Sequence, residues 1–333
     1  MTWVTHATLK QVQLALTLHS CSHTSSTRAN RKAGERKRSM LTRRNFMIRT
    51  AGAAAAAGTA MHLGSGAAGA NPGSPVFGTG LRTFIGGAPV EQSGVAEWER
   101  RRLSVAAARL STDFAGLLRG ELDSLIGRFA VAVDDIAAAR SALSKARTLI
   151  GSDGLRELLA AELAASEAAT RTALTASDGQ WAISTTEIVS DRGSAAGFVE
   201  WFGLARTTDA RAIWTDACPD HYIIATLTDG RQEVVEVTGG AILASRFVVD
   251  YADSTGVPIS ADPAYPLAVT GTAALADGTV IGGVRHQFRD EPGGGFRSRL
   301  AVAFPAAVPG LYIAEHEWHL ACEFGNWITA YLR

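Results

Sequence analysis

Before about residue 178, the pattern of hydrophobic and polar residues is typical of helices. Between about Val95 and Ala176 the sequence is rich in Ala, Leu, Glu and Arg and has no proline or histidine. Apolar residues recur there at intervals of three and four, which places them on one face of a helix. Breaks at 111–113 and 151–154 carry the cap and turn residues expected between helices. We therefore predict three or four helices and no catalytic cluster in this part of the chain.

After about Asp178 the pattern changes to short β-branched and aromatic runs separated by turn residues, which is typical of an antiparallel meander. The segment from about Tyr312 to Leu332 has no proline and predicts one long helix. An antiparallel sheet closed over a C-terminal helix is the helix-grip (Bet v 1-like) arrangement, and it encloses a ligand cavity. The predicted fold class is therefore α+β. The predicted strands lie near 181–188, 211–216, 221–228, 232–238, 243–251, 266–275, 279–290 and 295–304.

An export signal is predicted within the first 70 residues. The sequence MLTRRNFM, starting at Met40, is a twin-arginine pattern, and an Ala- and Gly-rich stretch at 51–60 and a small-x-small site at 68–70 follow it. This order is typical of a twin-arginine signal, so we expect an exported protein, secreted or in the cell envelope, that engages the twin-arginine translocase. The apolar stretch is too short and glycine-rich for a stable membrane span. Translation could start at Met1 or at Met40.

Charge is distributed unevenly between this signal and the rest of the chain. The chain has 32 basic and 32 acidic residues in 333. Residues 1–70 hold ten of the basic residues and one acid, which leaves a net charge of −9 for the remainder. Nucleic-acid binding needs a basic footprint, so an acidic body argues against it. We expect four segments: the export signal with an N-terminal extension at 1–70, a Gly-, Pro- and Ser-rich linker at 71–91, the helical region at 92–177 and the helix-grip domain at 178–333.

The densest chemical cluster lies in the predicted last helix. His319 and Glu323 are four residues apart, so they lie within about 40° of each other on one helix face, where one cation could contact both. His316 lies on the same side. Taken alone, such a pair is equally consistent with a hydrogen-bonded surface pair.

Four further polar residues lie in predicted strands. His221 opens a strand, and Glu236 lies inside a hydrophobic one, where a carboxylate is costly unless it is paired or binds a metal. Glu233, with opposite strand parity, is the alternative to Glu236. His286 shares a strand face with Val284 and Phe288, a pattern that by itself favours a hydrogen-bonded core histidine.

The order of these motifs carries a family resemblance. The matching segments are Trp214…Pro219-Asp-His221, His286-Gln-Phe-Arg289-Asp290 followed by Gly295-Phe-Arg297-Ser-Arg299, and His319-x-x-x-Glu323. They resemble the W-H-P-x-D-H, H-x-x-R-D…G…R-S-R and H-x-x-x-E segments of the diacetylphloroglucinol and phloretin hydrolase family. The resemblance covers about 198–327, which is less than half of the chain.

The resemblance implies a helix-grip fold and a zinc-dependent hydrolase that cleaves a carbon–carbon bond next to the ketone of a small aromatic substrate. By this resemblance, Zn²⁺ would be held by His221, Glu236, His319 and Glu323, and His286 would transfer a proton beside the substrate. Zinc can polarise a carbonyl and lower the pKa of water. Cys218 stands where the family usually has a polar aromatic residue.

Other interpretations stay open at this point. The chain could be a metal-dependent hydrolase of simple esters or amides, an exported non-catalytic helix-grip module for an apolar ligand, or an exported structural protein. Cys218 and Cys322 could form a disulfide in an oxidising compartment or remain buried free thiols. Asp220 could support the metal site or serve packing, and the sequence does not decide whether the chain forms a homo-oligomer.

Overall fold

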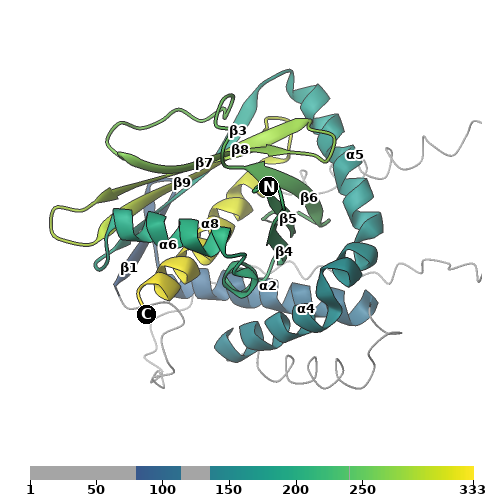
Figure 1. Cartoon of the computed structure of the whole chain (residues 1–333), viewed down its shortest axis with the longest axis horizontal. Helices are drawn as coiled ribbons and strands as arrows, with labels where there is room; N and C mark the ends of the chain where they lie inside the picture. Colours follow the sequence, from purple (N-terminus) through teal and green to yellow (C-terminus); the bar gives the residue numbers. More distant parts are fainter. Residues whose placement is uncertain (1–79, 114–135, 240) are drawn as a thin grey trace, which may run out of the picture. The chain divides into compact units, whose positions relative to one another are not determined.

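The computed structural model describes residues 80–113, 136–239 and 241–333 (Figure 1). The predicted export signal at 1–70 lies outside the described residues, and so do residues 71–79 of the predicted linker. Among the helices that are described, none has the length and apolar character needed to cross a membrane.

In the described part of the chain, nine antiparallel strands form one sheet, in the order β2-β1-β3-β9-β8-β7-β6-β5-β4. The run from β4 to β9 is a meander, as the β-branched and aromatic runs between turn signals predicted. The strands are β1 (Leu81–Ile85), β2 (Ala88–Val90), β3 (Trp181–Ser190), β4 (His221–Thr226), β5 (Gln232–Glu236), β6 (Ser245–Asp250), β7 (Leu267–Ala274), β8 (Val280–Asp290) and β9 (Phe296–Pro305).

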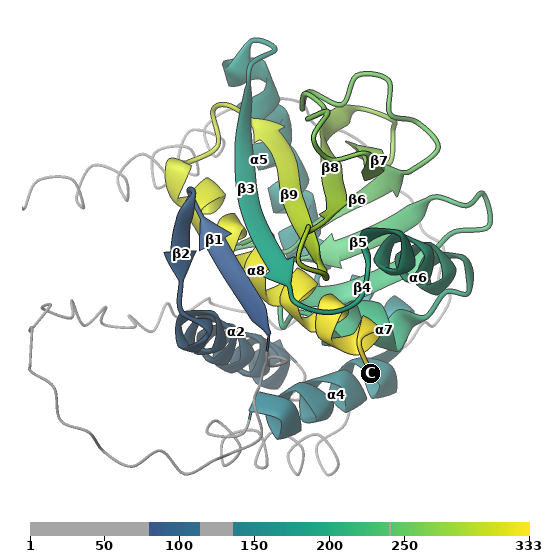
Figure 2. The ribbon, with the colours of Figure 1, turned by 90° about the vertical axis from the view of Figure 1, so that its left-hand side faces the viewer.

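The predicted long terminal helix is present as α8 (Gly310–Tyr331), and its residues 319–328 are all buried. The Thr186 hydroxyl of β3 donates a hydrogen bond to the Glu317 carbonyl of α8 at 2.7 Å. Figure 2 shows α8 between the sheet on one side and α2 and α4 on the other. The fold is therefore α+β, with a large antiparallel sheet that holds the C-terminal helix against one face.

The described part of the predicted helical region consists of α2 (Gln92–Asp113), α4 (Ile136–Leu158) and α5 (Ala160–Ser177). Gly151 has a left-handed φ of 71° that interrupts α4 at the break expected from the sequence. Buried residues of α2 and α4 form one apolar cluster with Tyr222, Ile223 and Val235 of β4 and β5. The helices and the sheet consequently belong to one compact unit, and the expected boundary near residue 177 does not separate two units.

Three short elements correct the sequence prediction. Residues 81–90, expected in a linker, form the β1–β2 hairpin, which pairs with β3. The predicted strand at 211–216 is a helix, α7 (Arg211–Asp216), in which Trp214 is buried. Helix α6 (Ala195–Thr207) was not predicted. It begins at the N-cap Ser194, whose side chain accepts a hydrogen bond from the Gly197 amide.

Candidate metal centre

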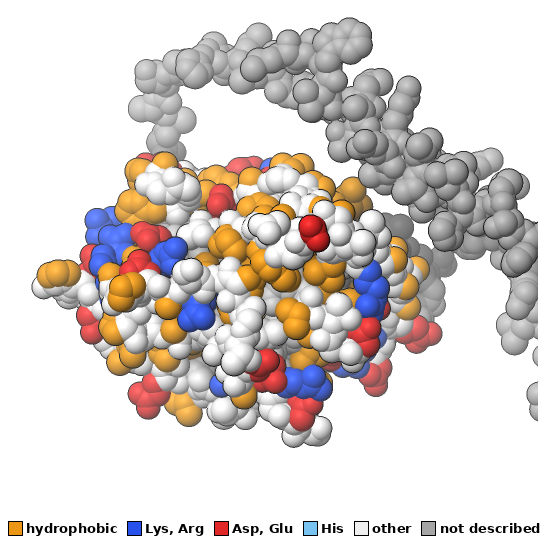
Figure 3. Space-filling model, turned by 90° about the horizontal axis from the view of Figure 1, so that it is seen from above, with side chains coloured by type: hydrophobic (Ala, Val, Ile, Leu, Met, Phe, Trp, Pro, Cys, Tyr) orange, Lys and Arg blue, Asp and Glu red, His pale blue; other side chains and the backbone are white. Residues whose placement is uncertain are grey.

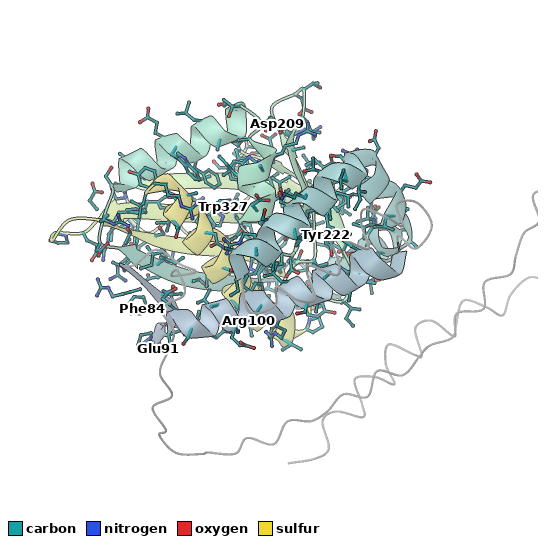
Figure 4. The ribbon with its side chains drawn as sticks, turned by 90° about the horizontal axis from the view of Figure 1, so that it is seen from below. Phe84, Glu91, Arg100, Asp209, Tyr222 and Trp327 are labelled. Carbon is teal, nitrogen blue, oxygen red and sulfur yellow. The ribbon has the colours of Figure 1, made fainter. Side chains whose placement is uncertain are left out.

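A β-bulge places His221 on the sheet face that α8 covers. In the pairing of β4 with β5, His221 lies opposite Glu236 and Ile223 lies opposite Val235, so Tyr222 is an extra residue. Ile223 packs with the N-terminal helices, and strict alternation would place His221 on that same outer face. The bulge places His221 beside Glu236 instead. Figure 4 shows Tyr222 close to α2 and α4.

Helix α8 supplies His319 and Glu323 from successive turns. Both side chains are buried, with 1% and 8% of the residue exposed, and Glu236 is 7% exposed. Carboxylates in such surroundings need a cationic or hydrogen-bonding partner. The face of the molecule seen in Figure 3 shows no histidine side chain on the described residues, in keeping with the burial of these imidazoles.

Four short distances join the donor atoms of His221, His319, Glu323 and Glu236, and Glu236 enters through its distance to His221. The Nε2 atom of His221 is 3.1 Å from Nε2 of His319. It is also 3.3 Å from Oε2 of Glu323 and 3.7 Å from Oε2 of Glu236. Nε2 of His319 is 3.7 Å from the same Glu323 oxygen. A tetrahedral shell with bonds of about 2.0–2.2 Å separates its ligand atoms by about 3.3–3.6 Å. The measured distances are therefore compatible with one small cation between these side chains.

Glu233, the alternative to Glu236, lies away from this cluster. Its carboxylate accepts hydrogen bonds from Arg156 at 2.5 and 3.1 Å and from Arg246 at 2.7 Å. These two arginines hold the pKa of Glu233 below its usual value, although burial acts in the opposite direction. Glu236 and Glu233 therefore lie on opposite faces of β5. Glu236 lies beside His221, and Glu233 forms ion pairs with Arg156 and Arg246.

The Nδ1 atoms of both imidazoles face hydrogen-bond acceptors. Nδ1 of His221 donates to the Trp214 carbonyl at 2.8 Å. Nδ1 of His319 lies 3.8 Å from Sγ of Cys218 and 3.8 Å from Oδ2 of Asp220. Acceptors at Nδ1 favour the tautomer that leaves the Nε2 lone pair free for a metal. Each histidine is thereby oriented for coordination through Nε2.

Cys218, His221 and His319 also lie close together and could bind a metal ion, with their ligand atoms within 4.8 Å of one another. Cys218 approaches His319 at Nδ1, whereas Glu323 and His221 approach it at Nε2. One ion at Nε2 cannot also bind the sulfur at Nδ1, so the two ligand sets are alternatives. The disulfide considered from the sequence is not formed, because Cys218 and Cys322 are both buried free thiols.

The pKa values of the acidic and basic groups in this cluster are shifted strongly by burial and by one another. Burial opposes ionisation of Glu323, yet hydrogen bonds from His221 and His319 hold its pKa well below the usual value. Burial likewise opposes protonation of His319, but the Cys218 thiolate and Asp220 raise its pKa well above the usual value. Burial raises the pKa of Glu236, with the two imidazolium charges acting against it. In the metal-free protein these shifts favour protonated imidazoles beside the ionised Glu323 carboxylate.

His286 and His316 lie on the same side of the sheet as the cluster. The ring of His286 packs 4.7 Å from that of Phe324, and its Nδ1 has no hydrogen-bond partner among the described residues. Burial lowers the pKa of His286 to about 4, so its imidazole is neutral at pH 7. His316 hydrogen-bonds to the Ser184 hydroxyl at 3.0 Å and stacks on His319. His286 thus lacks the partner of an ordinary core histidine.

Two residues of α2 reach this centre, although the sequence predicted no site in that region. Arg102 hydrogen-bonds to Asp220, and the Trp98 ring makes an edge contact with His319 at 6.0 Å between centroids. Trp98, Arg102, Ala106 and Leu110 recur every four positions and are all buried. A charged residue inside this buried stripe was the available signal.

The chain matches no known protein-family model, and no curated protein matches it. The likeness to the hydrolase family therefore depends on the motifs themselves and on the geometry of the residues within them.

Proposed function

We propose that this protein is a zinc-dependent hydrolase with a helix-grip (Bet v 1-like) fold, related to the diacetylphloroglucinol and phloretin hydrolases. The observation that carries the proposal is the convergence of His221, Glu236, His319 and Glu323. These residues come from two strands and a helix, and their buried donor atoms lie 3.1–3.7 Å apart in the measured pairs. Two histidines and two carboxylates are an accepted ligand set for zinc.

Charge balance supports a divalent cation at this position. With both imidazoles and the Cys218 thiol neutral, Glu236 and Glu323 carry two negative charges that one divalent ion would neutralise. Asp220 is neutralised separately by Arg102, which donates hydrogen bonds to both of its oxygens at 2.9 Å. A buried site of this kind is stable only when its charges are paired. When bound, zinc would supply Lewis acidity toward a carbonyl oxygen and toward water.

His286 is the proposed proton-transfer residue. Its neutral imidazole, with Nδ1 unpartnered among the described residues, can accept a proton from an attacking water and return it to the leaving group. In hydrolysis of an aryl ketone, water adds to the carbonyl carbon and the bond to the ring breaks. The products are a carboxylic acid and a ring that has gained a hydrogen. Electron-rich phenol rings accept that proton at carbon, which favours acylphloroglucinol-like substrates.

The direct test uses the purified chain with measured metal content. The wild type should contain about one zinc per chain and should hydrolyse acylphloroglucinols faster than simple phenyl esters. His319→Ala should lose both zinc and activity, because it removes a ligand atom. His286→Gln should keep its zinc and lose activity, because it removes the proton carrier only.

Glu233→Gln is the matched control, since it alters a carboxylate of the same strand outside the cluster. It should keep both zinc and activity. Full zinc content in His319→Ala would overturn the ligand assignment. A zinc-loaded wild type that cleaves only esters would replace the proposed substrate class, and one that cleaves neither would favour a binding module.

We further propose that the protein is exported by the twin-arginine translocase. The support is the order of the basic, apolar and small-residue segments at 40–70. Replacing Arg43 and Arg44 by lysines should retain the protein inside the cell, as measured by fractionation. Unchanged export of that variant would count against the proposal.

A further inference from the structure

Helix α2 contacts the metal centre through a buried ion pair. Arg102 directs Nε to both oxygens of Asp220 at 2.9 Å and a terminal nitrogen to Oδ1 at 2.8 Å. The side chains of Arg102 and Asp220 are 10% and 1% exposed. A guanidinium fork bound to both carboxylate oxygens fixes the orientation of the carboxylate as well as its charge.

The carboxylate that Arg102 holds faces a proposed ligand. Oδ2 of Asp220 lies 3.8 Å from Nδ1 of His319, on the ring edge opposite the proposed ion. Carboxylates in this position set the tautomer and the rotation of a metal-binding imidazole, and their loss commonly costs about 10–100-fold in metal affinity. Asp220 also directly precedes His221 in the chain. A shift of this carboxylate would therefore disturb both histidine ligands.

The same helix contacts α8 one turn away. Trp98 lies four residues before Arg102 and donates its indole N–H to Oε2 of Glu315 at 2.9 Å. Its ring edge also contacts the His319 imidazole. Trp98 of α2 thus contacts Glu315 and His319, which lie on successive turns of α8. Arg102 of α2 contacts Asp220 in the loop before β4.

Helix α4 also holds the loop that precedes β4. Arg147 is buried, donates to the Thr215 carbonyl at 2.8 Å and also hydrogen-bonds to the Pro219 carbonyl. The loop that carries Cys218 and Asp220 is therefore tied to both N-terminal helices. Such a connection is more than packing requires, because apolar residues of α2 and α4 already cover β4 and β5.

We propose that Arg102 is a positioning residue of the metal centre, which acts on the His319 ligand through Asp220 and makes α2 a functional part of the site. This inference rests on the proposed metal centre and deepens it. It assigns to the N-terminal helices, which lie outside the motif resemblance, the task of holding His319 in the orientation that coordinates through Nε2.

The test compares Arg102→Leu with Arg101→Leu in the full chain. Arg101 neighbours Arg102 on α2, and its side chain is 56% exposed and pairs with Glu315. Arg102→Leu should weaken Zn²⁺ binding about 10–100-fold, measured by competition with a chromophoric chelator. It should also alter the visible absorption of the Co²⁺-loaded protein, which reports ligand geometry. Arg101→Leu should leave both measurements at wild-type values.

Arg102→Leu leaves Asp220 as an unpaired buried charge, so it could fail to fold. The double variant Arg102→Leu/Asp220→Asn removes that charge and should fold, still with weakened binding and an altered Co²⁺ spectrum. Wild-type affinity and an unchanged spectrum in a folded Arg102 variant would overturn the positioning role alone. Failure of the wild type to bind Zn²⁺ or Co²⁺ would overturn the proposed metal centre as well.

Discussion

Glu236 and Glu233 allow the metal centre to be tested by two substitutions with opposite expected effects. Both residues lie on β5, and both are buried, at 7% and 1% exposure. Glu236 faces the two histidines, whereas Glu233 accepts hydrogen bonds from Arg156 and Arg246. Glu236→Gln should therefore weaken metal binding without destabilising the fold, and Glu233→Gln should destabilise the fold without weakening metal binding.

The magnitudes follow from the contacts. Four-ligand zinc sites bind with about 10–16 kcal/mol, so one ligand contributes roughly 3–4 kcal/mol, or about 10²–10³-fold in affinity. In the metal-free protein, burial raises the pKa of Glu236, so its neutral amide replacement should change stability by less than about 1 kcal/mol. Glu233→Gln removes charged hydrogen bonds to two partly exposed arginines and should cost about 2 kcal/mol.

Two assays separate these effects. Chelator competition at fixed pH measures the zinc affinity of each variant, and urea unfolding in the presence of EDTA measures the stability of the metal-free protein. The reasoning would be refuted if Glu236→Gln bound zinc as tightly as the wild type. It would also be refuted if Glu233→Gln lost zinc affinity as strongly as Glu236→Gln while remaining folded. In that case the two carboxylates on opposite faces of β5 would affect zinc binding equally.

Three further predictions concern neighbouring residues. Cys218→Ser should keep zinc within about tenfold of wild-type affinity if the sulfur only accepts a hydrogen bond at Nδ1; loss of zinc would identify the cysteine as a ligand. Burial lowers the pKa of His286 to about 4 from 6.5, so the unfolded chain binds this proton first as pH falls. Its contribution to stability, about 3 kcal/mol, is present above pH 6.5 and lost toward pH 4, and acid unfolding of His286→Gln should show a shallower pH dependence over that range. A Cβ at Gly239 would lie 2.4 Å from Cα of His316, so Gly239→Ala should lower the unfolding free energy by about 1–3 kcal/mol, whereas Gly203→Ala, in a helix with open space around it, should not lower it.

The elements that sequence periodicity predicted correctly are those with long, regular patterns. The strands from β4 to β9 are runs rich in β-branched and aromatic residues between turn signals, and α8 has no interrupting proline. Short elements follow tertiary packing instead. The segment 211–216 has β-branched residues but forms α7, because Trp214 is buried between Phe202 and Trp327. The β1–β2 hairpin was concealed by the Gly- and Pro-rich composition around it.

The candidate site also has parts that the sequence predicts and parts that it does not. Helix geometry predicts that His319 and Glu323 share a face, and strand parity separates Glu236 from Glu233. The extra residue at Tyr222 cannot be seen in the alternation of β4, so the face occupied by His221 did not follow from that strand alone. The contact of Arg102 with Asp220, which are 118 residues apart, depends on the packing of α2. The sequence marks Arg102 only as a charged residue in a buried stripe and does not indicate its partner.

The chain order of the metal centre has a consequence for biosynthesis. His319 follows His221 by 98 residues, and Arg102 precedes Asp220 by 118. During vectorial synthesis, β4 and β5 emerge from the ribosome well before α8, so the nascent chain presents only two of the four donor side chains. Capture of the proposed ion by all four side chains would then wait until translation has passed Glu323. Occupancy of the proposed site would thus require synthesis past Glu323, and any truncation before that residue would leave two of the four proposed ligands.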